Sequence, residues 1–325
     1  MTISVEKPGA QTCVQDYPGR VGYWNQGFPP SGPMDSWSFR LANLLVGNLE
    51  GTSGLEIQLM GPTLRFDVDS IAAVTGAELD VKLDGQLVEQ WTSFHVKAGQ
   101  KLQIGIAKQG ARAYLAVSGG FSAPQLLGSA STFFGAGIGG FDGQALSVGQ
   151  KLPIGAQRGE PGWTVLEEHR PPISSDRRWA IEVVAGPNDD WIDDAAHERF
   201  LSIDWKLSSQ SGRTGYRLEG PDWTFTEKAV NKGPEHGSEP SNILDQGYPL
   251  GGINLGGQTP IILVNDAPSM GGFICPYTVP SGAFWKLGQS KPGDLYRFTL
   301  RTVEQAQDLR RVVDSHCNSS HLREI

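Results

Sequence analysis

Short alternations of apolar and polar residues, separated by turn signals, run through most of the chain. Residues 55–59 and 64–68 alternate on either side of Gly61-Pro62, and a period of two is typical of strands with one buried face. The dipeptide Asp84-Gly85 predicts a tight hairpin, and the continuous apolar run 113–117 predicts a buried strand. The pattern therefore predicts a chain built mainly of β-strands.

Helical spacing occurs at only a few places. Asp35 can cap a short helix that Gly47 can end, because the apolar residues between them fall on one face; these are Trp37, Leu41, Leu44 and Leu45. A second helix is predicted near the C-terminus from Val303, Ala306, Leu309 and Val313, and we expect the tail from residue 314 to 325 to fray. The predicted fold class is mainly β with a few short helices.

Two sequence motifs occur twice, in the same order. Gly32–Trp37 returns as Gly186–Trp191, shifted by 154 positions, and Met60–Phe66 returns as Glu219–Phe225, shifted by 159. In each copy the first motif is expected to precede a capped helix, and the second to separate two alternating strands. The repeat indicates two related β-barrel-like domains.

The domain boundaries follow from this repeat and from composition. We expect the first domain at residues 1–156, a polar and proline-bearing linker at 157–178, the second domain at 179–300, and the C-terminal helix and tail at 301–325. Two domains suit a chain of 325 residues. A cleft between such domains would be a favoured place for a ligand.

Composition and charge weigh against several classes of function. The net charge of −8, without a cluster of lysine and arginine, argues against nucleic acid or an anionic membrane as a partner. No apolar run reaches the ~20 residues of a membrane span, and the N-terminal residues do not resemble a secretory signal. Cys13, Cys275 and Cys317 form no metal-binding pattern. We expect a cytoplasmic protein with reduced thiols and no bound metal.

One stretch, Pro234–Phe273, concentrates polar side chains around a buried strand. It begins with a turn-forming segment that contains His236, Ser241 and Asn242, continues into the apolar strand 261–264, and ends in the turn 265–269 and the pair Gly271-Gly272. Loops held by rigid strands often carry binding groups, and glycines let a backbone approach a ligand closely. The same composition also fits a solvated hairpin loop.

Several motifs resemble those of the biotin-dependent carboxyltransferase family, which includes allophanate hydrolase subunit 2, the C-subunit of 5-oxoprolinase, and KipA. The resemblance extends over residues 3 to 310 and is carried by Val14–Arg20, Pro30–Asp35, Leu55–Ile57, Ser211–Gly220 and Pro292–Asp294. It implies two cyclophilin-like β-barrel domains, in agreement with the repeat.

Within that family the chain is most similar to the carboxyltransferase part of urea carboxylase. The motifs that favour this branch are Pro240–Ile243, Asp266–Ser269, Gly272–Pro276 and Trp285–Gln289. The resemblance implies transfer of a carboxyl group from carboxybiotin to a urea-like nitrogen of a small amide. The sequence contains no ATP-grasp region and no Met-Lys-Met biotinylation motif, so we expect it to work with biotin carboxylase and biotin carrier components, and with a KipI-like (allophanate hydrolase subunit 1) chain.

Carboxyl transfer needs hydrogen-bond donors for a developing oxyanion and acceptors that orient the substrate N–H groups. We predict Asp266, Ser269 and Asn242 as the catalytic residues, with Asp266 orienting or deprotonating the substrate. Substrate binding is predicted for Ser241, Arg213, Tyr216, Gly271, Gly272, Asp35 and His236. Structural alternatives are a turn cap for Asp266, a helix cap for Asp35 and an interdomain salt bridge for Arg213.

Two other functions remain open from the sequence. The chain could be a 5-oxoprolinase component that acts with an ATP-dependent partner. It could instead be a non-catalytic, KipA-type binding protein that sequesters a KipI-like chain. Substrate profiling of a reconstituted complex separates these alternatives from urea carboxylation.

Overall fold

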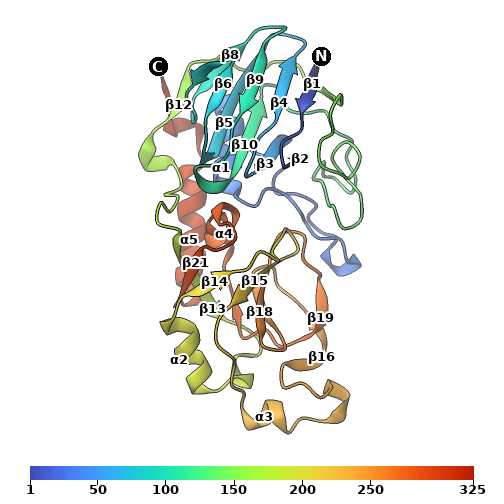
Figure 1. The fold of residues 1–325 in the computed structure, drawn as a ribbon, viewed down its shortest axis with the longest axis vertical. Helices are drawn as coiled ribbons and strands as arrows, with labels where there is room; N and C mark the ends of the chain where they lie inside the picture. Colours follow the sequence, from blue (N-terminus) through green and yellow to red (C-terminus); the bar gives the residue numbers. More distant parts are fainter. The chain divides into compact units, whose positions relative to one another are not determined.

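The computed structural model describes all residues from 1 to 325. The chain divides into two compact units, and each is described by itself. Unit 1 comprises Met1–Val21, Pro30–Ile173 and Val313–Ile325, and unit 2 comprises Gly22–Pro29 and Ser174–Val312. Strands dominate both units (Figure 1), so the predicted mainly β fold class with a few short helices is confirmed. The domain boundaries drawn from the sequence stay a prediction.

Unit 1 is built on two sheets, with strand orders β11-β1-β4-β9-β6-β7 and β2-β3-β10-β5-β8. Their inward side chains form one hydrophobic core that includes Ile3, Leu64, Phe66, Val74 and Leu115. The strands are β1 (Thr2–Lys7), β2 (Gln11–Gln15), β3 (Gly54–Gln58), β4 (Thr63–Phe66), β5 (Ser70–Glu78), β6 (Val81–Leu83), β7 (Gln86–Val88), β8 (Ser93–Val96), β9 (Lys101–Ile104), β10 (Gln109–Val117) and β11 (Lys151–Pro153).

Local signals in the sequence of unit 1 are confirmed. Asp84 and Gly85 form the turn between β6 and β7 with φ angles of 47° and 84°. The predicted helix is α1 (Ser36–Leu45), which packs on β5 and β10. Its cap is Asp35, whose carboxylate accepts from Ser38 N at 3.0 Å, and Gly47 follows it with a φ of 74°.

Unit 2 contains a closed barrel with the strand order β13-β20-β17-β18-β15-β14-β21. These strands are β13 (Arg178–Ala185), β14 (Trp205–Leu207), β15 (Gly215–Glu219), β17 (Gly252–Gly256), β18 (Thr259–Leu263), β20 (Tyr277–Thr278) and β21 (Leu295–Leu300). A separate ribbon pairs β16 (Asn242–Gly247) with β19 (Met270–Phe273). The helices are α2 (Asp194–Ser202), α3 (Glu227–Val230), α4 (Phe284–Gln289) and the start of α5 (Val303–His316).

Aromatic side chains fill part of the interior of this barrel. Phe200, from α2, stacks on Tyr277 and Phe298 with centroid distances of 4.4 and 4.3 Å. Trp205 and Trp223 stack on each other at 5.5 Å. All five rings are nearly inaccessible, so each buries a large apolar area and anchors α2 to the barrel.

The sequence repeat is reproduced only in part. In unit 1, β3 and β4 flank Gly61-Pro62 as predicted. In unit 2, β15 precedes Gly220-Pro221, but residues 222–226 form no strand, and only Phe225 makes an isolated bridge, to Ile192. The helix cap of unit 2 also differs from the prediction. The repeated motif ends in the short 3-10 helix Asp189–Trp191, and the residue that caps α2 is Asp193, which lies after the motif.

The C-terminal tail is ordered, which corrects the expectation that it frays. After α5 and the 3-10 turn Ser319–His321, β22 (Leu322–Glu324) pairs with β12 (Trp163–Val165) in unit 1. Three histidines gather beside this ribbon: the Nδ1 atoms of His169 and His316 lie 3.0 Å apart, and the rings of His169 and His321 stack at 3.8 Å. His169, far away in the sequence, thus contacts two histidines of the tail and helps to hold it.

This cluster predicts that acid loosens the tail. Burial, together with the charges of His169 and His321, lowers the pKa of His316 from its ordinary value of 6.5. The unfolded chain therefore takes up the proton at a higher pH than the folded chain, and the stabilisation present above 6.5 is lost as the pH falls below it. We expect the amides of β22 to exchange faster at about pH 5.5 than at about pH 7.5, after correction for intrinsic rates.

The matched controls are His316→Asn, which should abolish most of this pH dependence, and His95→Asn, an exposed histidine on β8 that should leave it intact. Equal protection of β22 at the two pH values in the wild-type chain would contradict the prediction.

Candidate functional site

The stretch Pro234–Phe273 lies entirely in unit 2 and forms two pairs of strands. Its outer pair is β16 and β19, and its inner pair, β17 and β18, belongs to the barrel (Figure 1). The apolar run predicted as a strand is β18, and the turn that follows it leads into β19. The segment thus places its polar turns and its Gly-Gly pair next to rigid barrel strands.

Two predicted site residues, Arg213 and Asp266, form a buried ion pair. Arg213 Nε donates to Asp266 Oδ2 at 2.8 Å and Nη2 donates to Oδ1 at 3.2 Å. The Asp266 amide also donates to the carbonyl of Arg213 at 2.8 Å. The side chains are only 5% and 3% exposed. The ion pair has a structural role, because it links two segments of unit 2. The roles of Arg213 and Asp266 toward a substrate stay predictions.

The Gly-Gly pair and Ser269 are organised around Tyr248. The Tyr248 hydroxyl accepts from Phe273 N at 2.6 Å and donates to Phe273 O at 3.2 Å, while the Tyr248 amide donates to Ser269 O at 2.8 Å. Gly271 faces the phenol ring, and a Cβ there would lie 2.9 Å from its Cε2 atom. Burial raises the pKa of Tyr248, which keeps the phenol neutral. Gly272 lies beside Gly271 on β19.

Other predicted residues in this stretch make local hydrogen bonds. The Oγ atom of Ser241 is buried and accepts from Gly257 N at 3.1 Å. Asn242 begins β16 and pairs across the ribbon with Phe273. His236 accepts from Leu244 N at 3.2 Å through Nδ1. These contacts shape the outer ribbon; none of the three residues lines the pocket described below.

Two predicted residues lie elsewhere. Asp35 belongs to unit 1, where it is fully buried and caps α1, the structural alternative considered for it. Tyr216 is on β15, buried, and pairs with Ile262 of β18. It contributes to the barrel wall and is absent from the lining of the pocket.

A pocket of about 470 Å³ opens between the barrel and the outer ribbon of unit 2. It is lined by Gly212, Thr214, Gly215, Arg217, Tyr248, Asn254, Ile261, Leu263, Pro268, Met270, Gly271 and Phe273. This volume lies in the range of small-molecule sites, which combine apolar walls with a few polar groups. Of the residues predicted from the sequence, only Gly271 is part of the lining.

Asn254 is the unusual polar group in this pocket. It lies on β17, is 3% exposed, and its buried Oδ1 atom has no hydrogen-bond partner. A buried acceptor without a donor costs free energy, so such groups are rare and often mark a binding function. The sequence analysis did not predict Asn254 as a site residue. The signal that could have identified it is a polar residue between two apolar residues, Ile253 and Leu255, of the same strand.

Arg217 brings a positive charge to the same pocket. Its Nη1 donates to Gln210 O at 2.9 Å, and the other N–H groups of the guanidinium have no acceptor within the protein. Arg217 is exposed, in contrast to the buried Arg213. The arginine that can bind a carboxylate in the pocket is therefore Arg217, and not the predicted Arg213.

Comparisons with known proteins agree with this fold. A family model described as "Carboxyltransferase domain, subdomain A and B" matches residues 26–300. The chain belongs to this family. The crystal structure of the urea amidolyase of K. lactis superposes with a TM-score of 0.93 at 38% identity, covering 98% of this chain and 20% of that one. The resemblance drawn from the sequence motifs is confirmed.

Curated relatives come from two groups. Urea amidolyase of Saccharomyces cerevisiae is 41% identical over 319 residues, which cover 96% of this chain and 17% of the relative. The C-subunit of 5-oxoprolinase from Escherichia coli is 33% identical over 313 residues, which cover 95% of this chain and 94% of the relative. The chain therefore spans about a fifth of the urea amidolyases it matches.

Two further findings concern the chain as a whole. No helix is both long enough and apolar enough to cross a membrane. All three cysteines are buried and free of disulfide bonds, and burial raises the pKa of Cys275 to about 11 and that of Cys317 to about 12. Both thiols are therefore protonated and unreactive near neutral pH.

The ion pair predicts a large loss of stability when one partner is removed. Asp266→Ala should lower the free energy of unfolding by about 3–5 kcal/mol, because it removes a carboxylate that pairs with the buried Arg213 guanidinium through two hydrogen bonds. The measurement is unfolding in guanidinium chloride. Asp222→Ala, at an exposed position of unit 2, should change stability by less than about 0.5 kcal/mol. The double variant Arg213→Met/Asp266→Leu should recover much of the stability that Asp266→Ala loses. If the double variant is as unstable as Asp266→Ala, the assignment of a buried ion pair is contradicted.

The contact between Gly271 and Tyr248 gives a second prediction. Gly271→Ala should cost about 1–3 kcal/mol of stability, because the new methyl group forces the phenol away from Phe273. Gly247→Ala is the matched control, since a Cβ at Gly247 on β16 would meet nothing within 4 Å. Equal melting temperatures for the two variants would show that the phenol is not held as described.

Proposed function

We propose that this chain is the carboxyltransferase component of a biotin-dependent carboxylase and moves a carboxyl group to a nitrogen of urea or a similar small amide. Its identity of 41% with a urea amidolyase supports the reaction class. The single observation in the site that carries the proposal is the unpaired, buried Oδ1 atom of Asn254. A urea-like molecule has N–H donors that would satisfy this acceptor.

The lining residues would then share the work of positioning. An amide nitrogen is a weak nucleophile because its lone pair is delocalised, so its orientation toward the carboxyl group matters strongly. Asn254 Oδ1 would hold one N–H of the substrate and fix the direction of that nitrogen. Arg217 would bind the negative charge of the carboxylate with its free N–H groups. The apolar walls would limit the access of water.

Carboxybiotin on a separate carrier would supply the carboxyl group. The pocket fits such a group in chemistry, because Ile261, Leu263 and Phe273 offer apolar contacts for the ring beside the polar groups of Asn254 and Arg217. We further propose biotin carboxylase and biotin carrier components, and a KipI-like chain, as the partners that the reaction requires. The roles of Asp266, Ser269 and Asn242 are proposed to be those of residues that shape the pocket.

A second candidate is a 5-oxoprolinase component. The observation that favours it is the match over 94% of the length of the 5-oxoprolinase C-subunit from Escherichia coli, at 33% identity. 5-Oxoproline also presents one amide N–H, so Asn254 could accept from either substrate. The higher identity with the urea amidolyase is the reason for placing urea-like substrates first.

Reconstitution separates the two candidates. The chain is combined with a biotin carboxylase, a biotin carrier and a KipI-like chain, and fixation of labelled bicarbonate is measured with urea or other small amides. ATP-dependent loss of 5-oxoproline is measured in parallel with its own partner proteins. We expect fixation that depends on both urea and this chain. Turnover of 5-oxoproline without any fixation onto urea-like amides would overturn the first proposal.

Asn254→Leu gives a test in which activity and stability move in opposite directions. We expect kcat/KM for the amide to fall about 10- to 100-fold, the size of one lost hydrogen bond to the substrate. The melting temperature of the free protein should rise, because an unpaired buried acceptor is removed. A structural asparagine would instead lose stability on this change.

The matched control is Asn188→Leu, at another buried asparagine of unit 2. Asn188 Oδ1 accepts from Cys275 N at 2.9 Å and from Gln246 Nε2 at 2.6 Å, so its removal should lower the melting temperature. If Asn254→Leu lowers the melting temperature as Asn188→Leu does, with kcat/KM unchanged, Asn254 does not bind the substrate.

A further inference from the structure

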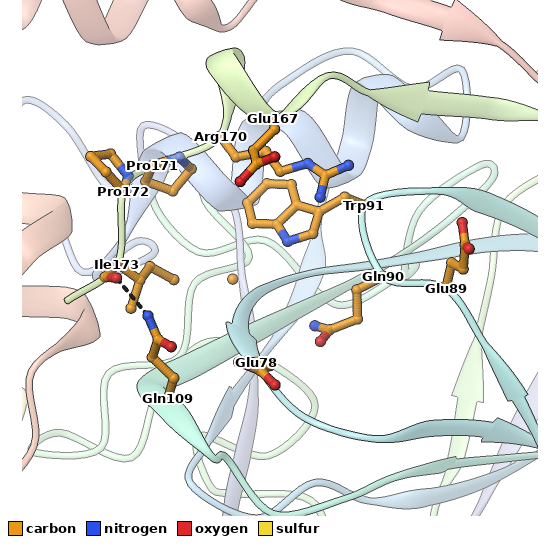
Figure 2. A pocket seen from close by; sticks show the side chains of 11 residues that line it. Glu78, Glu89, Gln90, Trp91, Gln109, Glu167, Arg170, Pro171, Pro172 and Ile173 are labelled. Atoms are coloured by element: carbon orange, nitrogen blue, oxygen red, sulfur yellow. Dashed lines mark hydrogen bonds between the residues drawn. The ribbon is translucent and has the colours of Figure 1, made fainter. Parts of the chain in front are cut away.

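Unit 1 contains a separate pocket of about 660 Å³ that the proposed reaction does not use. Its walls come from the end of β5, the residues after β7, the start of β10, and the segment that follows the 3-10 helix Glu167–His169 (Figure 2). The lining residues that matter for its chemistry are Glu78, Glu89, Trp91, Glu167, Arg170 and Ile173.

The charge of this pocket is negative. The lining carries three exposed carboxylates, those of Glu78, Glu89 and Glu167, and one guanidinium, that of Arg170. None of the three carboxylates takes part in a salt bridge. Arg170 is engaged elsewhere: its Nε and Nη2 atoms donate to Val165 O at 2.9 and 2.6 Å. Its guanidinium carbon lies 5.6 Å from the centroid of the Trp91 ring, which it covers. The pocket therefore favours a cation.

Trp91 adds an unused hydrogen-bond donor. Its side chain is only 8% exposed, yet the indole N–H has no acceptor in the protein. Figure 2 shows the nitrogen edge of the ring turned toward the open space among the lining residues. The neighbouring amides are occupied, since Gln90 bonds to Leu79 N and Ala77 O and Gln109 bonds to Ile173 O at 2.6 Å. A ligand in this pocket would meet one free donor.

The backbone holds Trp91 in this orientation. Its φ angle is 61°, a region that a bulky residue rarely adopts and that the surroundings must enforce. The Trp91 amide donates to Val74 O at 2.8 Å, and its carbonyl accepts from Val165 N at 2.9 Å and Thr164 Oγ1 at 3.2 Å. β5 and β12 thus fix the backbone of Trp91 before any ligand arrives, and Arg170 covers the face of its ring.

We propose that this pocket binds a small organic cation that also carries a carbonyl or carboxylate acceptor, the chemistry of a basic amino acid, free or within a peptide. The ammonium or guanidinium group would be attracted by the excess negative charge of Glu78, Glu89 and Glu167. The acceptor oxygen would take the indole N–H of Trp91. The aliphatic part of such a ligand would contact Pro171 and Ile173.

Calorimetric titration of the full chain tests the proposal with defined probes. L-arginine and L-lysine represent the free source, and N-acetyl-glycyl-lysyl-glycinamide represents the peptide source. Citrulline and norleucine are controls of similar shape and no net charge, which keep the α-ammonium and carboxylate groups but lack the side-chain cation. We expect saturable binding of at least one cationic probe, weakened by added salt, and no binding of the neutral controls. Tighter binding of the free amino acids or of the peptide shows which of the two is the ligand. Binding of citrulline or norleucine as tight as that of the cations, or no binding of any cation, would overturn the proposal.

Three variants locate the binding. Glu89→Gln should weaken the affinity about fivefold, the size expected for one exposed ion pair. Trp91→Phe keeps an aromatic ring but removes the N–H donor, and should weaken it about fivefold to tenfold. Glu168→Gln removes an adjacent exposed carboxylate outside the lining and should leave the affinity unchanged. Circular dichroism confirms that each variant is folded. Equal affinities for Glu89→Gln and the wild-type chain would place the cation elsewhere.

Discussion

The buried ion pair between Arg213 and Asp266 joins the two chain segments that frame the pocket of unit 2. Arg213 lies just before β15 and Asp266 just after β18, and these strands pair antiparallel in the barrel. Two charges withdrawn from water tolerate little separation, because each would be left buried without its partner. The pair therefore fixes the ends of both strands, and with them Thr214 and Pro268, which line the pocket within two residues of the ion pair.

On this rigid frame the pocket of unit 2 keeps one buried side-chain acceptor, Asn254 Oδ1, without a donor. Most buried polar atoms of unit 2 have partners, as Asn188 and Tyr248 do, whereas Asn254 Oδ1 has none. Leaving an acceptor unpaired lowers stability, and a substrate that donates an N–H would regain that free energy on binding. Stability and function then conflict at one atom, which is common where a site is preorganised for a ligand.

Local features of the sequence predicted much of the fold and little of the pocket. The strand β18 and the helix cap at Asp35 depend on neighbouring residues only, and both are confirmed. The lining of the pocket depends instead on which strands pair, so that Asn254 and Arg217 come together only through β17, β18 and β15. The ordered tail was missed for the same reason, since β22 needs its partner β12, more than a hundred residues earlier in the sequence.

The most direct test of this account is a crystal structure of the chain with a urea-like amide bound. We predict that a substrate nitrogen lies within about 2.7–3.2 Å of Asn254 Oδ1, the range of an N–H···O hydrogen bond, with the Arg213–Asp266 pair unchanged. An amide bound away from this pocket, with Asn254 Oδ1 still unpaired, would contradict the account.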